Sequence, residues 1–165
     1  MRRALKLLGL GLLLAVQAMA NAATPATVPD TIEQRVAACI ACHGREGATT
    51  NAGYFPRLAG KPAGYLFNQL VSFRDGRRFN TDMAYMVQHL SDAYLREMAD
   101  YFAGLQLPYP PVSPVSDATP EQLQRGRQLV REGDAARGIP ACVQCHGAAL
   151  TGVQPAIPGL LGLPR

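Results

Sequence analysis

The sequence lacks the residue combinations on which most enzymes depend. It contains no recognisable acid–base pair, no nucleophile–histidine pair and no phosphate-binding loop, and its carboxylates are scattered as on a solvated surface. No segment alternates convincingly between apolar and polar residues, so we expect no substantial β-sheet. Histidine and cysteine are scarce, with three and four copies among 165 residues. All four cysteines and two of the three histidines fall within two short motifs.

The two motifs are copies of one pentapeptide, C-x-x-C-H, at residues 39–43 and 142–146. This pentapeptide is the attachment signature of c-type haem, in which two thiols bond to the porphyrin and the histidine binds the iron. Residues three apart on a helix share a face and are about 4.5 Å apart along its axis, so both thiols can reach one ring. We therefore predict two c-type haems. Their attachment points are Cys39, Cys42, Cys142 and Cys145, and their proximal axial ligands are His43 and His146.

Three other uses of paired cysteines compete with haem attachment. A thiol–disulfide exchange site needs a βαβ context that the flanking residues do not supply. A four-thiolate zinc site would join two pairs that lie 103 residues apart, and it would leave the histidine after each pair unexplained. Structural disulfides are possible in an exported protein, but three-residue spacing along a helix is a poor geometry for a bridge.

The N-terminal residues have the order of a secretory signal peptide. Three cations, Arg2, Arg3 and Lys6, precede an apolar run at residues 7–16 and a small-x-small cleavage signal at 18–20. The run is too short to span a bilayer, so we predict a signal peptide over residues 1–20, with an uncleaved membrane anchor as the alternative. Because c-type haem is attached outside the cytoplasm, we expect a periplasmic protein. Cleavage would leave 13 basic against 12 acidic residues, a balance that implies no nucleic-acid partner.

Related sequence follows each motif, which indicates an internal repeat. Residues 55–62 and 157–164 both carry two prolines, and the offset between the copies is 103 residues at the cysteines and 102 at the prolines. A proline-rich linker with little freedom to be helical separates the copies. We expect a first domain at residues 28–105, a linker at 106–118 and a second domain at 119–165.

Apolar periodicity and end signals predict helices throughout both copies. The predicted helices run from Asp30 to Cys42, from Pro62 to Arg74, from Ser91 to Gly104, and from Thr119 to near Gly133. Asp30 with Glu33 is typical of a capping box, and so is Thr119 with Gln122. We interpret Met98 as a core residue because it lies on the apolar stripe of its helix.

The order of these motifs resembles a known family. C-x-x-C-H-G at residues 39–44 is followed by F-P-x-L-A-G at 55–60, F-R-x-G-x-R from 73, M-x-x-M at 83–86, L-S at 90–91 and Y-F at 101–102, and residues 140–147 repeat the first part. This order is similar to one domain of the di-haem class I cytochromes of the c4 type. The resemblance implies an all-α fold of two tandem haem domains that pass single electrons.

The resemblance also implies the sixth ligand of the first iron and the partners of the histidines. The ligand is a methionine from the loop around residues 83–86; Met83 is favoured because it lies eight residues before Ser91, with Met86 and His89 as alternatives. The carbonyls of Pro56 and Pro158 are expected to accept hydrogen bonds from His43 and His146. Arg57 and Arg78 are weaker candidates for pairing with haem propionates, because surface arginines are common.

The second copy departs from the family pattern. It reaches Arg165, which aligns with Ala63, so the counterpart of residues 64–104 with its distal methionine is missing. We therefore expect an incomplete second domain and a second haem without a visible distal ligand. The chain would then be a fragment of a longer product, or a natural truncation with a five-coordinate or water-ligated second iron, or the first copy or another subunit would supply the ligand.

The implied function is electron transfer rather than catalysis. The chain would take electrons from a quinol-oxidising complex or a dehydrogenase and pass them to a terminal oxidase or another cytochrome. Any association with a membrane would be peripheral, through these partners. The alternatives are a cytochrome subunit of a periplasmic dehydrogenase and a haem protein with an open iron at the second haem.

Overall fold

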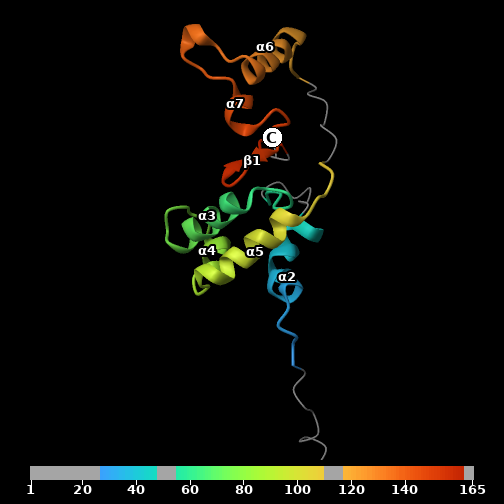
Figure 1. Ribbon diagram of the computed structural model, residues 1–165, viewed down its shortest axis with the longest axis vertical. Helices are drawn as coiled ribbons and strands as arrows, with labels where there is room; N and C mark the ends of the chain where they lie inside the picture. The colour runs from blue at the N-terminus through green and yellow to red at the C-terminus, as the bar shows by residue number, and fades with distance from the viewer. Residues whose placement is uncertain (1–26, 48–54, 110–116, 162–165) are drawn as a thin grey trace, which may run out of the picture. The chain divides into compact units, whose positions relative to one another are not determined.

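Helices make up most of the regular structure in the computed structural model, which describes residues 27–47, 55–109 and 117–161 (Figure 1). The first copy contributes α2 (Ile32–His43), η1 (Arg45–Gly47), α3 (Ala63–Arg74), α4 (Thr81–Val87) and α5 (Asp92–Gly104). The second contributes α6 (Pro120–Arg131), η2 (Ala135–Arg137), α7 (Cys142–His146) and two short strands, β1 (Gly152–Val153) and β2 (Ile157–Pro158). All of these elements belong to one unit, residues 31–165. The fold is the all-α class that the sequence predicts.

Side-chain caps set the starts of four helices, α2, α4, α5 and α6. Ser91 accepts a hydrogen bond from the amide of Tyr94 at the start of α5, and Thr119 and Gln122 form both bonds of a capping box at α6, as predicted. The prediction of Asp30 as the cap of α2 is wrong by one residue. Thr31 has the extended backbone of an N-cap, and its hydroxyl accepts from the amide of Gln34, 3.4 Å away.

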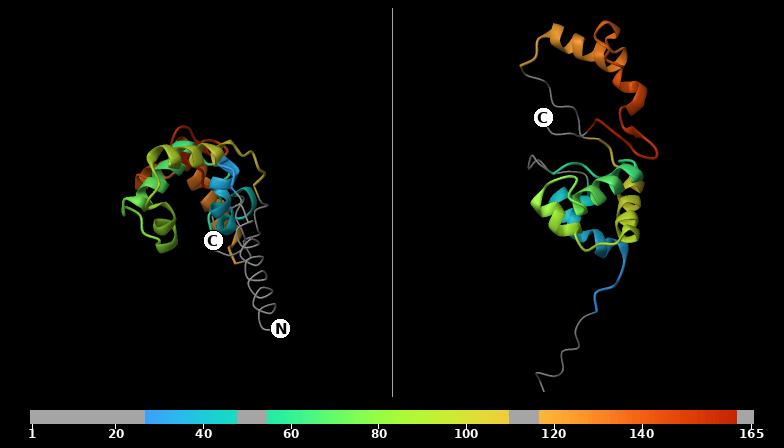
Figure 2. Two further views of the ribbon diagram at one scale, coloured as in Figure 1. Left: turned by 90° about the horizontal axis from the view of Figure 1, so that it is seen from below. Right: turned by 90° about the vertical axis from the view of Figure 1, so that its left-hand side faces the viewer.

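The core of the first copy lies among four helices. Helix α3 packs against α4 and α5, and α2 packs against α5, so their apolar faces meet in one cluster (Figures 1 and 2). The buried members of this cluster are Val36, Leu66, Phe73, Val87, Leu95, Met98, Ala99 and Phe102. Met98 is 3% exposed, which confirms its prediction as a core residue. Burial of each large aliphatic or aromatic side chain contributes about 1.5–3 kcal/mol before entropy is counted.

The segment that carries Met83 and Met86 is helical, not the loop that the sequence predicts. The Asn80 side chain accepts a hydrogen bond from the amide of Met83 at 3.0 Å and so caps α4. Val87, 2% exposed, anchors the end of this helix in the core. One capping residue and one buried residue form too short a pattern for apolar periodicity to predict this helix from the sequence.

The second copy has less buried surface in its described part. No residue of α6 is buried, and Arg125 on this helix pairs with Asp134 before η2. Strands β1 and β2 pair antiparallel, with Gly152 opposite Pro158 and Val153 opposite Ile157. This hairpin, with two residues in each strand, agrees with the expectation of no substantial sheet.

Some sequence predictions fall on residues that the structure does not describe. They are the signal peptide at residues 1–20, the middle of the linker at 110–116 and the end of the second copy at 162–165. Among the described residues, no helix is both long and apolar enough to cross a bilayer.

Candidate functional site

The first motif occupies the last turn of α2. Cys39 is half-buried and packs against the core cluster, Cys42 is exposed, and neither thiol forms a disulfide. Burial raises the pKa of the Cys39 thiol. Gly44 ends the helix with φ of 79°, a left-handed value that a side chain would strain. The two thiols and the histidine therefore lie together at a helix end, next to an apolar core.

The ring of His43 is buried and fixed in orientation. It is 6% exposed, its Nδ1 lies 2.8 Å from the carbonyl oxygen of Pro56, and Phe55 meets it edge-on with ring centroids 6.1 Å apart. A carbonyl oxygen can only accept, so Nδ1 must carry the proton and Nε2 keeps its lone pair. Burial lowers the pKa of His43, which favours this neutral form, although the Pro56 carbonyl partly opposes the shift. The arrangement leaves Nε2 able to bind a metal.

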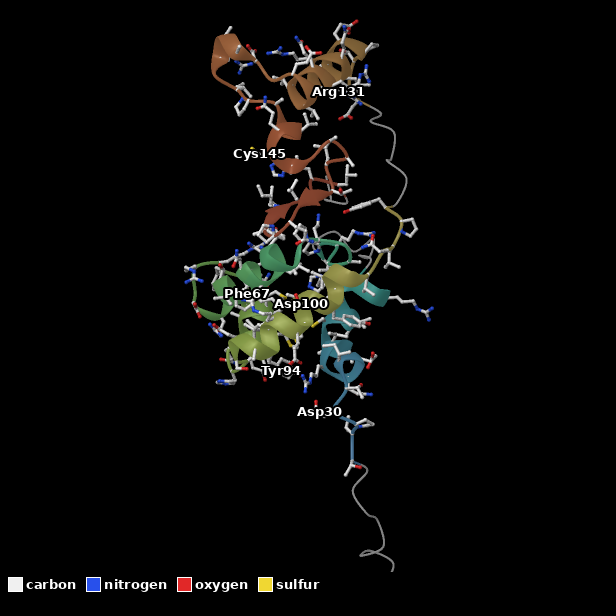
Figure 3. The ribbon with its side chains drawn as sticks, in the orientation of Figure 1. Asp30, Phe67, Tyr94, Asp100, Arg131 and Cys145 are labelled. Atoms are coloured by element: carbon white, nitrogen blue, oxygen red, sulfur yellow. The ribbon has the colours of Figure 1, made fainter. Side chains whose placement is uncertain are left out.

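The second motif repeats this arrangement on α7. Cys142 is half-buried, Cys145 (labelled in Figure 3) is exposed, and neither forms a disulfide. His146 Nδ1 lies 2.6 Å from the carbonyl oxygen of Pro158, and Gly147 ends the helix with φ of 82°. Both histidines thus have the proline contact that the resemblance implies. The histidine environments differ in burial, since His146 is only half-buried.

The three candidates for a distal ligand lie in different environments. Met83 is half-buried and packs against the core cluster, as Cys39 does from α2. Met86 is 43% exposed, and His89 is exposed in the turn after α4. Of the three candidates, Met83 is therefore the one that packs against the core cluster, as Cys39 of the first motif also does.

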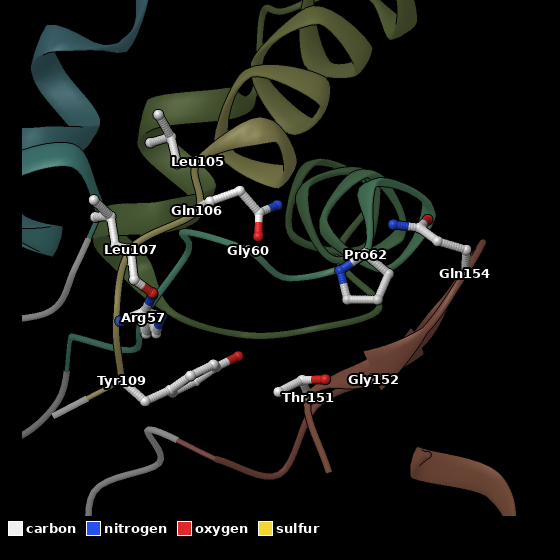
Figure 4. Close-up of a pocket in the computed structure, with 10 residues that line it drawn as sticks. All are labelled: Arg57, Gly60, Pro62, Leu105, Gln106, Leu107, Tyr109, Thr151, Gly152 and Gln154. Carbon is white, nitrogen blue, oxygen red and sulfur yellow. The ribbon is translucent and has the colours of Figure 1, made fainter. Parts of the chain in front are cut away.

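Arg57 is not the surface residue that the sequence suggests. It is 2% exposed, and its guanidinium donates to the carbonyls of Ala59, Leu107 and Pro108 at 2.9, 2.5 and 3.1 Å. It also stacks on Tyr109, 4.2 Å from the ring centroid, beside the cavity drawn in Figure 4. Arg78, in contrast, is exposed and donates to Gln69 at 2.6 Å. Arg57 therefore ties the start of the linker to the first motif's loop.

The described side chains form no other arrangement for a metal. No group of three or more His, Cys, Asp or Glu residues within the described ranges is placed to hold an ion, and the two cysteine pairs are not brought together as a zinc site would require. Each motif instead offers two free thiols and one imidazole with a fixed tautomer. This donor set fits a covalently attached iron porphyrin.

Comparison with known proteins gives the family. No family model matches the sequence. A thiosulfate dehydrogenase electron acceptor from Thiomonas intermedia is 38% identical over 162 residues, which cover 98% of this chain and 70% of the relative. Cytochrome c4 from Pseudomonas aeruginosa is 35% identical over 89% of this chain and 68% of its own length. The crystal structure of reduced cytochrome c4 from Pseudomonas stutzeri matches with a TM-score of 0.60 and 32% identity, over 78% of this chain and 68% of that one.

Proposed function

Because this chain belongs to the cytochrome c4 family of class I c-type cytochromes, we propose that it carries two haems, one at each C-x-x-C-H motif. Members of this family are electron carriers, and the chain is an electron-transfer protein rather than an enzyme. The haem iron supplies one-electron chemistry, while the protein holds the ring, limits its contact with water and fixes the iron ligands.

The protein residues have distinct roles in this proposal. Cys39 and Cys42 hold one ring, and Cys142 and Cys145 hold the other. His43 and His146 bind the irons through Nε2. Met83 is the sixth ligand of the first iron, a thioether that raises the reduction potential relative to a second imidazole.

The repeated histidine–proline contact is the observation that supports this proposal most directly. His43 and His146 lie 2.8 and 2.6 Å from the carbonyls of Pro56 and Pro158, on loops that share one sequence pattern. Such a contact sets the tautomer and the ring orientation of an iron ligand, and it increases the basicity of the ligating nitrogen. A buried imidazole N–H needs an acceptor in any protein, but the repetition of this contact after each cysteine pair supports a shared role for the two histidines as ligands.

We also propose a periplasmic location and a dehydrogenase as the electron donor. The signal-peptide pattern at residues 1–20 supports the location. The name of the Thiomonas relative, an electron acceptor of thiosulfate dehydrogenase, supports a donor of this class. Cys42 and Cys145 are exposed, which supports this proposal because thioethers at these positions would leave one edge of each haem open to a partner.

Haem number is tested by intact mass after expression in a host that matures c-type cytochromes. The mature protein should have lost residues 1–20 and gained two haems. Replacing both cysteines of one motif by alanine should remove one haem and leave the other. A colourless product with four free thiols, or a wild-type protein whose mass shows only one haem, would contradict the proposal.

A further inference from the structure

Lys61 is the only lysine of the sequence besides Lys6, and it is buried. Its residue is 3% exposed, and its Nζ donates to the carbonyls of Gly159 and Leu161 at 3.1 and 3.2 Å. These acceptors lie 98 and 100 residues further along the chain. The contact therefore joins the two copies of the repeat directly.

The burial of this ammonium group is costly, and no carboxylate among the residues that the structure describes pairs with it to offset the cost. Lysine is almost never fully buried unless it is paired, because a charge loses its hydration. Within the described residues, the hydrogen bonds of Lys61 Nζ go to two backbone carbonyls. Burial, followed by the nearby charge of Arg57, lowers the pKa of Lys61. A methionine would fill a similar volume without the cost of removing a charge from water. A lysine at this buried position therefore indicates a specific role for its amine.

The loops that Lys61 joins are those that orient the two histidines. Lys61 ends the segment that begins at Pro56, whose carbonyl holds His43. Gly159 follows Pro158, whose carbonyl holds His146. The ammonium thus binds the carbonyl next to the one that fixes the second histidine.

Close packing around Gly159 leaves its loop little freedom. A Cβ on Gly159 would lie 2.4 Å from the carbonyl oxygen of Thr151, so the backbone packs closely against the residue before β1 and is also bound by Lys61. The position equivalent to Gly159 in the first copy is Arg57, which binds the linker instead. Figure 4 shows Pro62, the residue after Lys61, facing Gly152 and Gln154 across the same junction.

We propose that Lys61 is a positioning residue that fixes the Pro158 loop against the first copy and thereby sets the His146–Pro158 hydrogen bond that tunes the second haem iron. This inference rests on the proposed attachment of a haem at the second motif. Loosening the loop weakens the hydrogen bond, makes His146 a less basic ligand and stabilises the ferric state less. The potential of the second haem should then rise.

Amine labelling of the folded holoprotein tests the burial directly. An acetylating reagent should leave Lys61 unmodified in the native protein and modify it after denaturation. The tryptic peptide of residues 58–74 reports the outcome, because the Lys61–Pro62 bond resists cleavage. The variant Arg131→Lys provides a matched control, since Arg131 is exposed at the end of α6 (Figure 3) and its replacement should react readily. Equal reactivity at the two positions would overturn the proposal.

Redox titration of Lys61→Met tests the tuning. Loss of a nearby positive charge alone would lower the potential of the second haem, because a cation disfavours the ferric state; a loosened hydrogen bond would raise it. We expect a rise at the second haem, little change at the first, and a return toward the wild-type value in Lys61→Arg. An unchanged or lowered potential would overturn the inference. Absence of a haem at the second motif would instead contradict the proposed function, and the haem count separates these results.

Discussion

The backbone N–H of Gly64 donates a hydrogen bond to the carbonyl oxygen of Pro155, 2.9 Å away. Gly64 lies in the first turn of α3, and a Cβ added to it would be only 2.6 Å from that same oxygen. The contact is therefore possible only because residue 64 has no side chain. With the Lys61 contact, it joins the first copy to the hairpin of the second.

Replacing Gly64 by alanine should show whether helix propensity or this contact has the larger effect on the free energy of unfolding. Alanine is favoured over glycine within a helix by about 0.5–1 kcal/mol, so Gly64→Ala would stabilise α3 if nothing else were near. Because of the clash we expect Gly64→Ala to lower the free energy of unfolding and to speed hydrogen exchange in residues 151–161. Gly126→Ala in α6, where nothing lies within 4 Å, should instead stabilise by up to about 1 kcal/mol. Equal stabilisation by both variants would show that the junction does not form in solution.

The assignment of Met83 predicts unequal effects for the two methionines of α4. Met83→Ala should lower the potential of the first haem and abolish the absorption band of thioether-ligated ferric haem, because water or nothing then replaces sulfur. The reduced variant should also bind carbon monoxide. Met86→Ala, which removes a side chain that is 43% exposed, should leave the spectrum unchanged. The opposite pattern would transfer the assignment to Met86.

Arg57 and Arg78 should differ sharply in their contribution to stability. Arg57→Ala removes the donor to three carbonyls, two of them in the linker, and we expect a loss of about 3 kcal/mol in urea unfolding. Arg78→Ala removes an exposed contact with Gln69 and should cost less than about 1 kcal/mol. Losses of similar size would mean that the burial of Arg57 is not maintained.

The ion pair of Asp134 with Arg125 should make stability depend on pH in the acid range. The hydrogen bond from Arg125 lowers the pKa of Asp134 below its usual value. A group whose pKa is lowered by folding stabilises the protein above its unfolded pKa, and this contribution is lost as the pH falls through the folded value. Between about pH 5 and pH 2, Asp134→Asn should therefore lose less stability than the wild type. Glu132→Gln, which removes a neighbouring exposed carboxylate, should follow the wild-type curve; if it behaves like Asp134→Asn, the effect is one of net charge.

Local signals were sufficient for most of the helices. Ser91 and the Thr119–Gln122 box start α5 and α6 where the sequence predicts, because a cap depends on residues only three apart. The same rule fails at α2 only in choosing between two adjacent candidates, Asp30 and Thr31. The cysteine motifs and the histidine–proline contacts were likewise accessible, the first from spacing and the second from family resemblance.

Contacts between residues far apart in the sequence could not be predicted from it. Two of the three acceptors of Arg57 lie 50 and 51 residues away, and those of Lys61 lie 98 and 100 residues away. Every one of these acceptors is a backbone carbonyl, and carbonyls are present at every position, so no sequence pattern marks the partner. The two buried cations could therefore not be told from surface residues before the structure was known.

The junction between the copies should tolerate evolutionary change very unequally. Lys61 and Gly64 supply specific chemical groups, an ammonium and an unobstructed amide, whereas Pro155 and Leu161 contribute oxygens that any amino acid would carry. Substitution of Leu161 can alter its side chain and keep the hydrogen bond. A change at Gly64, or a change at Lys61 to a residue without a cationic donor, removes the contact. Homologues that retain this junction should accordingly be recognisable from the first copy alone.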